Sequence, residues 1–179
     1  MARDYSIAID ISLSMGEPFS DMIPSKLQAS KEAVALLAQR VTVGGSRIAI
    51  TLFHEKPIPL LPLTNDYKVI LRALVELDFT GEGSALGDGI VEAVKMLRAS
   101  RGRDRLVVVL TDGGVTEGIP VKAAVLYAKY TGTPLKIIVL NRRIEENLKT
   151  EVETAGHPNL QMVLVETKQK LLSEILRLI

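Results

Sequence analysis

The stretch that decides the fold lies at residues 5–14 and reads Tyr-Ser-Ile-Ala-Ile-Asp-Ile-Ser-Leu-Ser. Its first half is a nearly continuous apolar run, which is typical of a strand buried on both faces of a parallel sheet. The run then ends in Asp10, Ser12 and Ser14, which place side-chain oxygens at alternate positions. A buried strand ends in such side chains when a cation, a cap or water receives them. This strand end is therefore the first candidate for a functional site.

Further apolar runs repeat the pattern along the chain, and longer segments with apolar residues three and four apart separate them. The runs predict strands at residues 48–53, 106–110, 135–140 and 160–165. The longer segments predict helices at residues 27–41, 67–77, 86–97, 120–128, 144–152 and 171–179. Ser25 is the expected N-cap of the first of these helices. This alternation indicates an α/β fold, a doubly wound, Rossmann-like three-layer sandwich with helices on both faces of a mostly parallel sheet.

One segment departs from the pattern. Residues 56–63 contain Pro57, Pro59 and Pro62. Proline has no N–H to donate to a neighbouring strand, so it is confined to the edge of a sheet. Because the segment closely follows the strand at 48–53, we expect it to return as an antiparallel edge strand.

Length and composition exclude several classes of function. The 179 residues predict a single domain over 1–179. The chain has no cysteine, which excludes a thiol nucleophile and Cys-ligated metal sites. A formal net charge of +1 gives no reason to expect a nucleic-acid partner. We see neither a signal peptide nor an apolar run of membrane-spanning length, and so expect a cytoplasmic protein.

Two more loops carry oxygen-bearing side chains. The strand at 106–110 runs into Thr111, Asp112 and two glycines, and the glycine-rich loop 81–89 carries Ser84 where we expect a helix N-cap. Doubly wound sheets bind their ligands beyond the carboxyl ends of the strands, where the strand order reverses. We therefore expect these side chains to converge with those of the first loop.

The predicted ligand set contains only hard oxygen donors, and it consists of Asp10, Ser12, Ser14, Ser84 and Asp112. Carboxylates and hydroxyls without nitrogen or sulfur suit Mg²⁺ or Mn²⁺. Neutral hydroxyls leave the bound ion electrophilic, so it would take a further charged oxygen from outside. A carboxylate on a partner protein would serve.

These motifs resemble the metal-ion-dependent adhesion site of von Willebrand factor A domains, in which D-x-S-x-S precedes a Thr in a glycine-rich loop and an Asp in T-D-G. The resemblance implies a six-stranded sheet with one antiparallel edge strand. It also implies direct metal ligation by Ser12, Ser14 and Ser84, with Asp10 and Asp112 acting through water. The chain departs from the pattern at Ser84, which replaces Thr, and at Leu13, where many members have Gly.

A narrower likeness concerns prokaryotic members found beside MoxR-type AAA+ ATPases, many of them membrane-anchored aerotolerance proteins. It rests on Pro24–Leu27, on residues 62–66 and on Ser84–Gly89. We see no membrane anchor in this chain, so the likeness carries over the domain type and not the cellular role. A MoxR-type AAA+ ATPase is one candidate partner. The sequence leaves open what Glu82 and His54, which flank the predicted site, contribute.

Two functions other than an interaction module would each require a sequence feature that this chain lacks. A Mg²⁺-dependent phosphoryl-transfer enzyme would use Asp10 as its nucleophile, but such enzymes need D-x-D and this chain has Ser12 at the second position. A nucleotide- or flavin-binding domain would need a glycine-rich turn directly after the first strand, where only Gly16 lies. We therefore expect a binding module and no enzyme.

Overall fold

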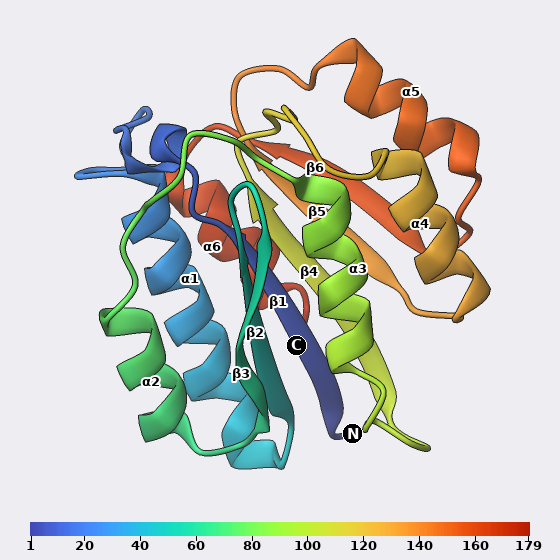
Figure 1. Cartoon of the computed structure of the whole chain (residues 1–179). Coiled ribbons are helices and arrows are strands. Elements are labelled where there is room, and N and C mark those ends of the chain that lie inside the picture. Colours follow the sequence, from blue (N-terminus) through green and yellow to red (C-terminus); the bar gives the residue numbers. More distant parts are fainter.

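A computed structural model describes all of residues 1–179 and arranges six strands in one sheet of order β3-β2-β1-β4-β5-β6 (Figure 1). The strands are β1 (Arg3–Asp10), β2 (Arg47–Phe53), β3 (Pro57–Thr64), β4 (Asp104–Thr111), β5 (Leu135–Leu140) and β6 (Leu160–Val165). All neighbouring pairs are parallel except β2 with β3. The predicted strand positions and the mixed sheet are confirmed.

Helices cover both faces of the sheet. They are α1 (Lys26–Val41), α2 (Tyr67–Val75), α3 (Leu86–Met96), α4 (Val121–Tyr130), α5 (Glu146–Ala155) and α6 (Lys168–Leu176). One buried cluster joins α1, α2 and α6 to one face, and a second joins α3, α4 and α5 to the other (Figure 1). The expected three-layer sandwich is therefore present. No helix is both long and apolar enough to cross a bilayer.

The proline-containing segment forms β3, which pairs antiparallel with β2 at the edge of the sheet as expected. Its register shifts between Ile48 and Ile50 and again between Ile50 and Thr51, so that β3 carries extra residues opposite β2. Such irregularities are common at sheet edges, where they bend the strand and limit further pairing.

The strand order reverses between β1 and β4, which lie side by side in the middle of the sheet. Ile9 pairs with Leu110, so Asp10 and Thr111 follow at the same level on neighbouring strands. The loops after these strands are therefore brought together by the pairing of the sheet itself.

Of the two predicted helix caps, one is confirmed and one is wrong. The Ser25 side chain accepts a hydrogen bond from the Gln28 N–H and caps α1. Ser84 does not cap α3, because the N-cap residue is Ala85, which has no side-chain cap. The hydroxyl of Ser84 is committed to another partner, which is described below.

Candidate functional site

Asp10 is the centre of a hydrogen-bond network at the carboxyl end of β1. Its Oδ1 accepts from the backbone N–H of Ser12 at 2.9 Å and from the Ser12 hydroxyl at 2.6 Å. Its Oδ2 accepts from the hydroxyls of Thr111 at 2.8 Å and Ser84 at 3.2 Å. The Asp10 side chain is fully buried, and these hydrogen bonds make its desolvation tolerable.

The first loop carries Ser12 and Ser14 past the end of β1. Residues 13–16 form a short 3-10 turn after Ser12, and the Oγ atoms of Ser12 and Ser14 lie 3.2 Å apart. The loop is anchored on both sides, because the Ile11 N–H donates to the Phe53 carbonyl and the Leu13 N–H to the Gly81 carbonyl. Ser12 is buried and Ser14 is half-buried, so the pair extends from Asp10 toward the surface.

The glycine-rich loop positions Ser84 beside Asp10. The Ser84 N–H donates to the Thr116 hydroxyl at 2.8 Å, and the Ser84 carbonyl accepts from the Thr116 N–H at 3.1 Å. The next residue is tied to the loop that follows β2, since the Ala85 N–H donates to the His54 carbonyl at 2.6 Å. These bonds hold the Ser84 side chain between two other loops, where it points at Asp10.

Asp112 lies next to Thr111 but has different partners. Its Oδ1 accepts from the Gly114 N–H at 3.3 Å, and its Oδ2 accepts from the Lys26 ammonium at 3.2 Å. The following residue, Gly113, has a φ of +86°, a conformation in which a side chain would be strained. The chain therefore turns sharply after Asp112 while its carboxylate stays near the network.

The electrostatics of the network reflect two carboxylates placed close together. Burial raises the pKa of Asp10, and the negative charge of Asp112 raises that pKa further. The hydrogen bonds from Ser12 and Thr111 oppose this effect. A positive charge placed between the two carboxylates would favour the ionised form of Asp10.

The donor set fits a hard divalent cation. The Ser12 and Ser84 hydroxyls both donate their hydrogens to Asp10, so their oxygen lone pairs remain available to an ion. The chain has no group of three or more His, Cys, Asp or Glu side chains that could hold a metal, so any site here must depend on hydroxyls. Mg²⁺ and Mn²⁺ accept such oxygen ligands and usually retain water as well.

The structure therefore brings four of the five predicted ligands into one hydrogen-bonded group, namely Asp10, Ser12, Ser14 and Ser84. Asp112 is close enough to affect the pKa of Asp10 but shares no hydrogen bond with that group. His54 and Glu82 contribute backbone contacts to the loops: the His54 carbonyl holds Ala85, and the Glu82 N–H donates to Glu55.

Sequence reasoning missed one charged residue of the site, Lys26. It is the first residue of α1 and is buried, and its ammonium contacts Asp112. A signal was present in the sequence: a lysine directly after a helix N-cap puts positive charge at the positive end of the helix dipole. A lysine in this position is stable only when an anion lies close to its ammonium group.

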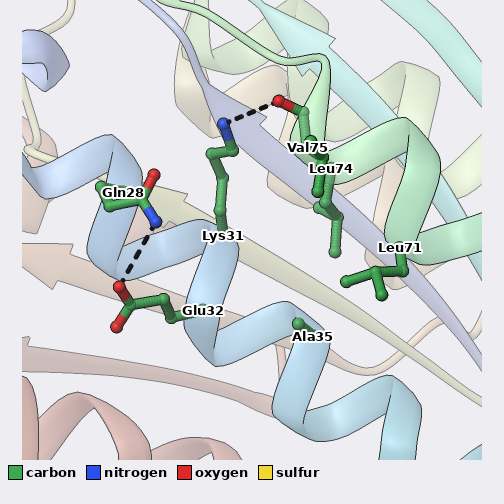
Figure 2. Close-up of a pocket in the computed structure, with 7 residues that line it drawn as sticks. All are labelled: Gln28, Lys31, Glu32, Ala35, Leu71, Leu74 and Val75. Carbon is green, nitrogen blue, oxygen red and sulfur yellow. Dashed lines mark hydrogen bonds between the residues drawn. The ribbon is translucent and has the colours of Figure 1, made fainter.

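The chain also has a groove away from this site, between α1 and α2, with a volume of about 220 Å³ (Figure 2). Its lining includes Leu71, Leu74 and Val75 from α2, and Figure 2 shows Lys31 reaching from α1 to the Val75 carbonyl. The Gln28 amide donates to Glu32 on the same helix. The polar side chains of the groove thus form hydrogen bonds with one another and with the backbone. At the end of the sheet, by contrast, side chains from three distant parts of the chain point toward Asp10.

Solved structures of other proteins share this fold over nearly the whole chain. An aerotolerance-related membrane protein from Bacteroides fragilis matches with a TM-score of 0.79 and 22% identity, covering 99% of this chain and 98% of that one. BatB from Bacteroides thetaiotaomicron gives a TM-score of 0.75 and 21% identity, over 99% and 100% of the chains. A von Willebrand factor type A structure from Catenulispora acidiphila gives 0.80 and 17%, over 99% and 41%.

A sequence relative and a family model add to this likeness. An uncharacterized protein of Borreliella burgdorferi is 35% identical over 116 residues, which is 63% of this chain and 33% of that protein. The chain thus spans about a third of the length of that relative. The model of the von Willebrand factor type A domain matches residues 6–115, which include all three loops of the site. The chain therefore belongs to the von Willebrand factor type A domain family.

Proposed function

We propose that this chain is a divalent-cation-dependent protein-interaction module. Domains of its family are generally interaction modules and are typically not enzymes, and many bind a divalent metal. Ser12, Ser14 and Ser84 would hold Mg²⁺ or Mn²⁺, with Asp10 and Asp112 supplying negative charge. The bound ion would offer a coordination position to a carboxylate of the partner. The observation that carries this proposal is the set of hydroxyls that Asp10 orients by accepting their hydrogens.

The surface around the site supports a protein as the ligand. Leu13, Phe79 and Val115 lie on the loops that build the site, and their exposed fractions are 47%, 42% and 41%. Exposed large apolar side chains that surround a polar centre are typical of interaction surfaces. We propose that the partner contacts these side chains while its carboxylate binds the ion.

A MoxR-type AAA+ ATPase in the cytoplasm is our candidate for the partner. Support comes from the likeness of Pro24–Leu27, residues 62–66 and Ser84–Gly89 to domains found beside such ATPases. The structural neighbours include an aerotolerance-related membrane protein, whose identity of 22% supports a common fold and not a common partner. The assignment therefore needs a direct binding measurement between this chain and such an ATPase.

The metal is tested by titrating the purified chain with Mn²⁺ in a calorimeter and following the bound ion by electron paramagnetic resonance. We expect one site in the wild type and at least a tenfold loss of affinity, about 1.4 kcal/mol, in Ser14→Ala. Ser14 is only half-buried, so this variant should fold. Glu153→Gln, which changes an exposed carboxylate on α5, is the control and should bind as the wild type does.

The partner is tested by surface binding of the ATPase to the immobilised chain in Mg²⁺ and in EDTA. We expect binding only in Mg²⁺, and its loss in Ser14→Ala but not in Glu153→Gln. Binding that is equally strong in EDTA would contradict the proposed mechanism even if the ATPase is the right partner.

A further inference from the structure

Lys26 places a positive charge inside the site, where a metal would also be. Its Nζ lies 3.2 Å from Asp112 Oδ2, and the side chains of Lys26 and Asp112 are only 11% and 9% exposed. The contact joins residues far apart in the sequence, since Lys26 opens α1 on one face of the sheet and Asp112 follows β4. The pair is therefore built by the tertiary fold.

The position of Lys26 is unfavourable for a lysine unless an anion is present. The N-terminus of a helix carries partial positive charge, which repels an ammonium. The first turn of α1 contains no acidic residue that could offset this charge. Burial adds a desolvation cost, which only a paired anion compensates. Asp112 is the group that meets both requirements.

The contact leaves room for an ion at Asp112. Each carboxylate oxygen can accept two hydrogen bonds, and the structure gives Oδ1 the Gly114 N–H and Oδ2 the Lys26 ammonium. One acceptor position on each oxygen remains for a water bound to a metal. Lys26 therefore need not leave when an ion arrives, and its charge continues to act on that ion.

We propose that Lys26 is the resident counter-cation of the site, which stabilises the metal-free state and lowers the affinity for the divalent ion. This inference rests on the proposed function, because it concerns the same metal site. Without Lys26 the carboxylates of Asp10 and Asp112 would present two negative charges to an ion. With Lys26 they present one, so the ion is held less tightly, and the loaded site keeps a net positive charge that favours an anionic ligand.

The test compares Lys26→Met with Lys31→Met in a Mn²⁺ titration and in thermal unfolding. Both variants remove one lysine charge from α1, but the Lys31 ammonium donates to the Val75 and Leu77 carbonyls and contacts no carboxylate of the site. Lys26→Arg retains the charge and is the rescue variant. Each protein is unfolded in EDTA and in saturating Mg²⁺.

We expect Lys26→Met to bind Mn²⁺ at least about tenfold more tightly than the wild type, as removal of a nearby charge should allow. We also expect its midpoint of thermal unfolding to fall in EDTA and to recover in Mg²⁺. Lys31→Met and Lys26→Arg should keep the wild-type affinity for Mn²⁺.

Unchanged or weaker Mn²⁺ binding in a folded Lys26→Met protein would overturn the inference, because the lysine would then have only a structural or positioning role. The proposed function can fail separately. If the wild type binds no Mn²⁺ and Lys26→Met does, the counter-cation role holds and the wild-type domain is not metal-dependent. If neither protein binds Mn²⁺, both proposals are wrong.

Discussion

Glu174 and Lys136 form an ion pair buried between α6 and β5. Lys136 Nζ lies 2.7 Å from Glu174 Oε2, and the two side chains are 7% and 6% exposed. The hydrogen bond from Lys136 lowers the pKa of Glu174 below its ordinary value of 4.5, although burial alone would raise it. Because the folded pKa is the lower one, this carboxylate contributes stability above the unfolded pKa and loses it as the pH falls through the folded pKa.

This pair predicts a pH-dependent difference between the wild type and Glu174→Gln. At pH 7 the variant leaves the Lys136 charge buried without its partner, and we expect it to lose about 3 kcal/mol of unfolding free energy. The loss should shrink as the pH is lowered from above to below the ordinary carboxyl pKa of 4.5. Urea unfolding across this range measures it, with the exposed Glu166→Gln as control. A loss that stays constant with pH would show that Glu174 acts through packing and not through its charge.

The grouping of Asp10, Ser12 and Ser14 could be predicted at this scale, because these residues follow one another at the end of β1 and in the loop after it. The direction of their hydrogen bonds could not be predicted. Ser84 was expected to cap α3, and the structure shows that its hydroxyl donates to Asp10 instead. The sequence does not reveal whether a hydroxyl will accept a hydrogen bond from a nearby helix N–H or donate one to a distant carboxylate, because that depends on how closely two distant loops approach.

At the scale of single elements, α3 lies so close to the sheet that one of its positions requires glycine. A Cβ atom on Gly89 would lie 2.6 Å from Cδ1 of Phe53, whose ring is fully buried in β2. The helix that begins after Ser84 is therefore held at a fixed distance from β2. Any side chain at position 89 would push α3 and the loop before it away from the sheet.

Gly89→Ala should consequently destabilise the protein, although alanine normally favours a helix by about 1 kcal/mol over glycine. We expect a net loss of about 2 kcal/mol in chemical denaturation. The added Cβ would also lie 2.7 Å from Cγ and 3.2 Å from Cβ of the buried Phe53, and these atoms cannot move away unless the backbone of β2 moves. Gly44→Ala is the control, since a Cβ atom there would meet nothing within 4 Å. Stabilisation by Gly89→Ala would mean that α3 can move away from β2 without a loss of unfolding free energy.

The elements themselves were largely predictable from the sequence, because apolar runs and helical spacing are local patterns. Ser25 as a cap of α1 and the prolines of β3 were also visible as single residues with one physical meaning. The close approach of α3 to β2 was not predictable, because a glycine in a helix has several possible causes and only the packed structure distinguishes them.

At the scale of the whole molecule, β3 is one of the two strands that end the sheet. Exposed strand edges can pair with other chains, and prolines prevent this because they cannot donate the required hydrogen bonds. Pro57, Pro59 and Pro62 all lie in β3, beside the exposed apolar side chains of Ile58 and Leu60. The prolines therefore protect an edge that would otherwise be apolar and open.

Replacing Pro57, Pro59 and Pro62 together by valine should make the chain self-associate. We expect a sedimentation coefficient that rises with protein concentration, whereas the wild-type value should stay constant. Lysine at the same positions is the matched control, since charged side chains also discourage edge pairing. A valine variant whose sedimentation does not depend on concentration would show that the bulges of β3 suffice to block pairing.

The placement of the site at the junction of β1 and β4 makes its assembly depend on correct folding at the centre of the sheet. The participating side chains come from three distant parts of the chain, and they meet only when the central strands have paired. A partially synthesised or misassembled chain cannot present them in one place. A partner that recognises this constellation would thus distinguish molecules whose central strands have paired from those whose strands have not.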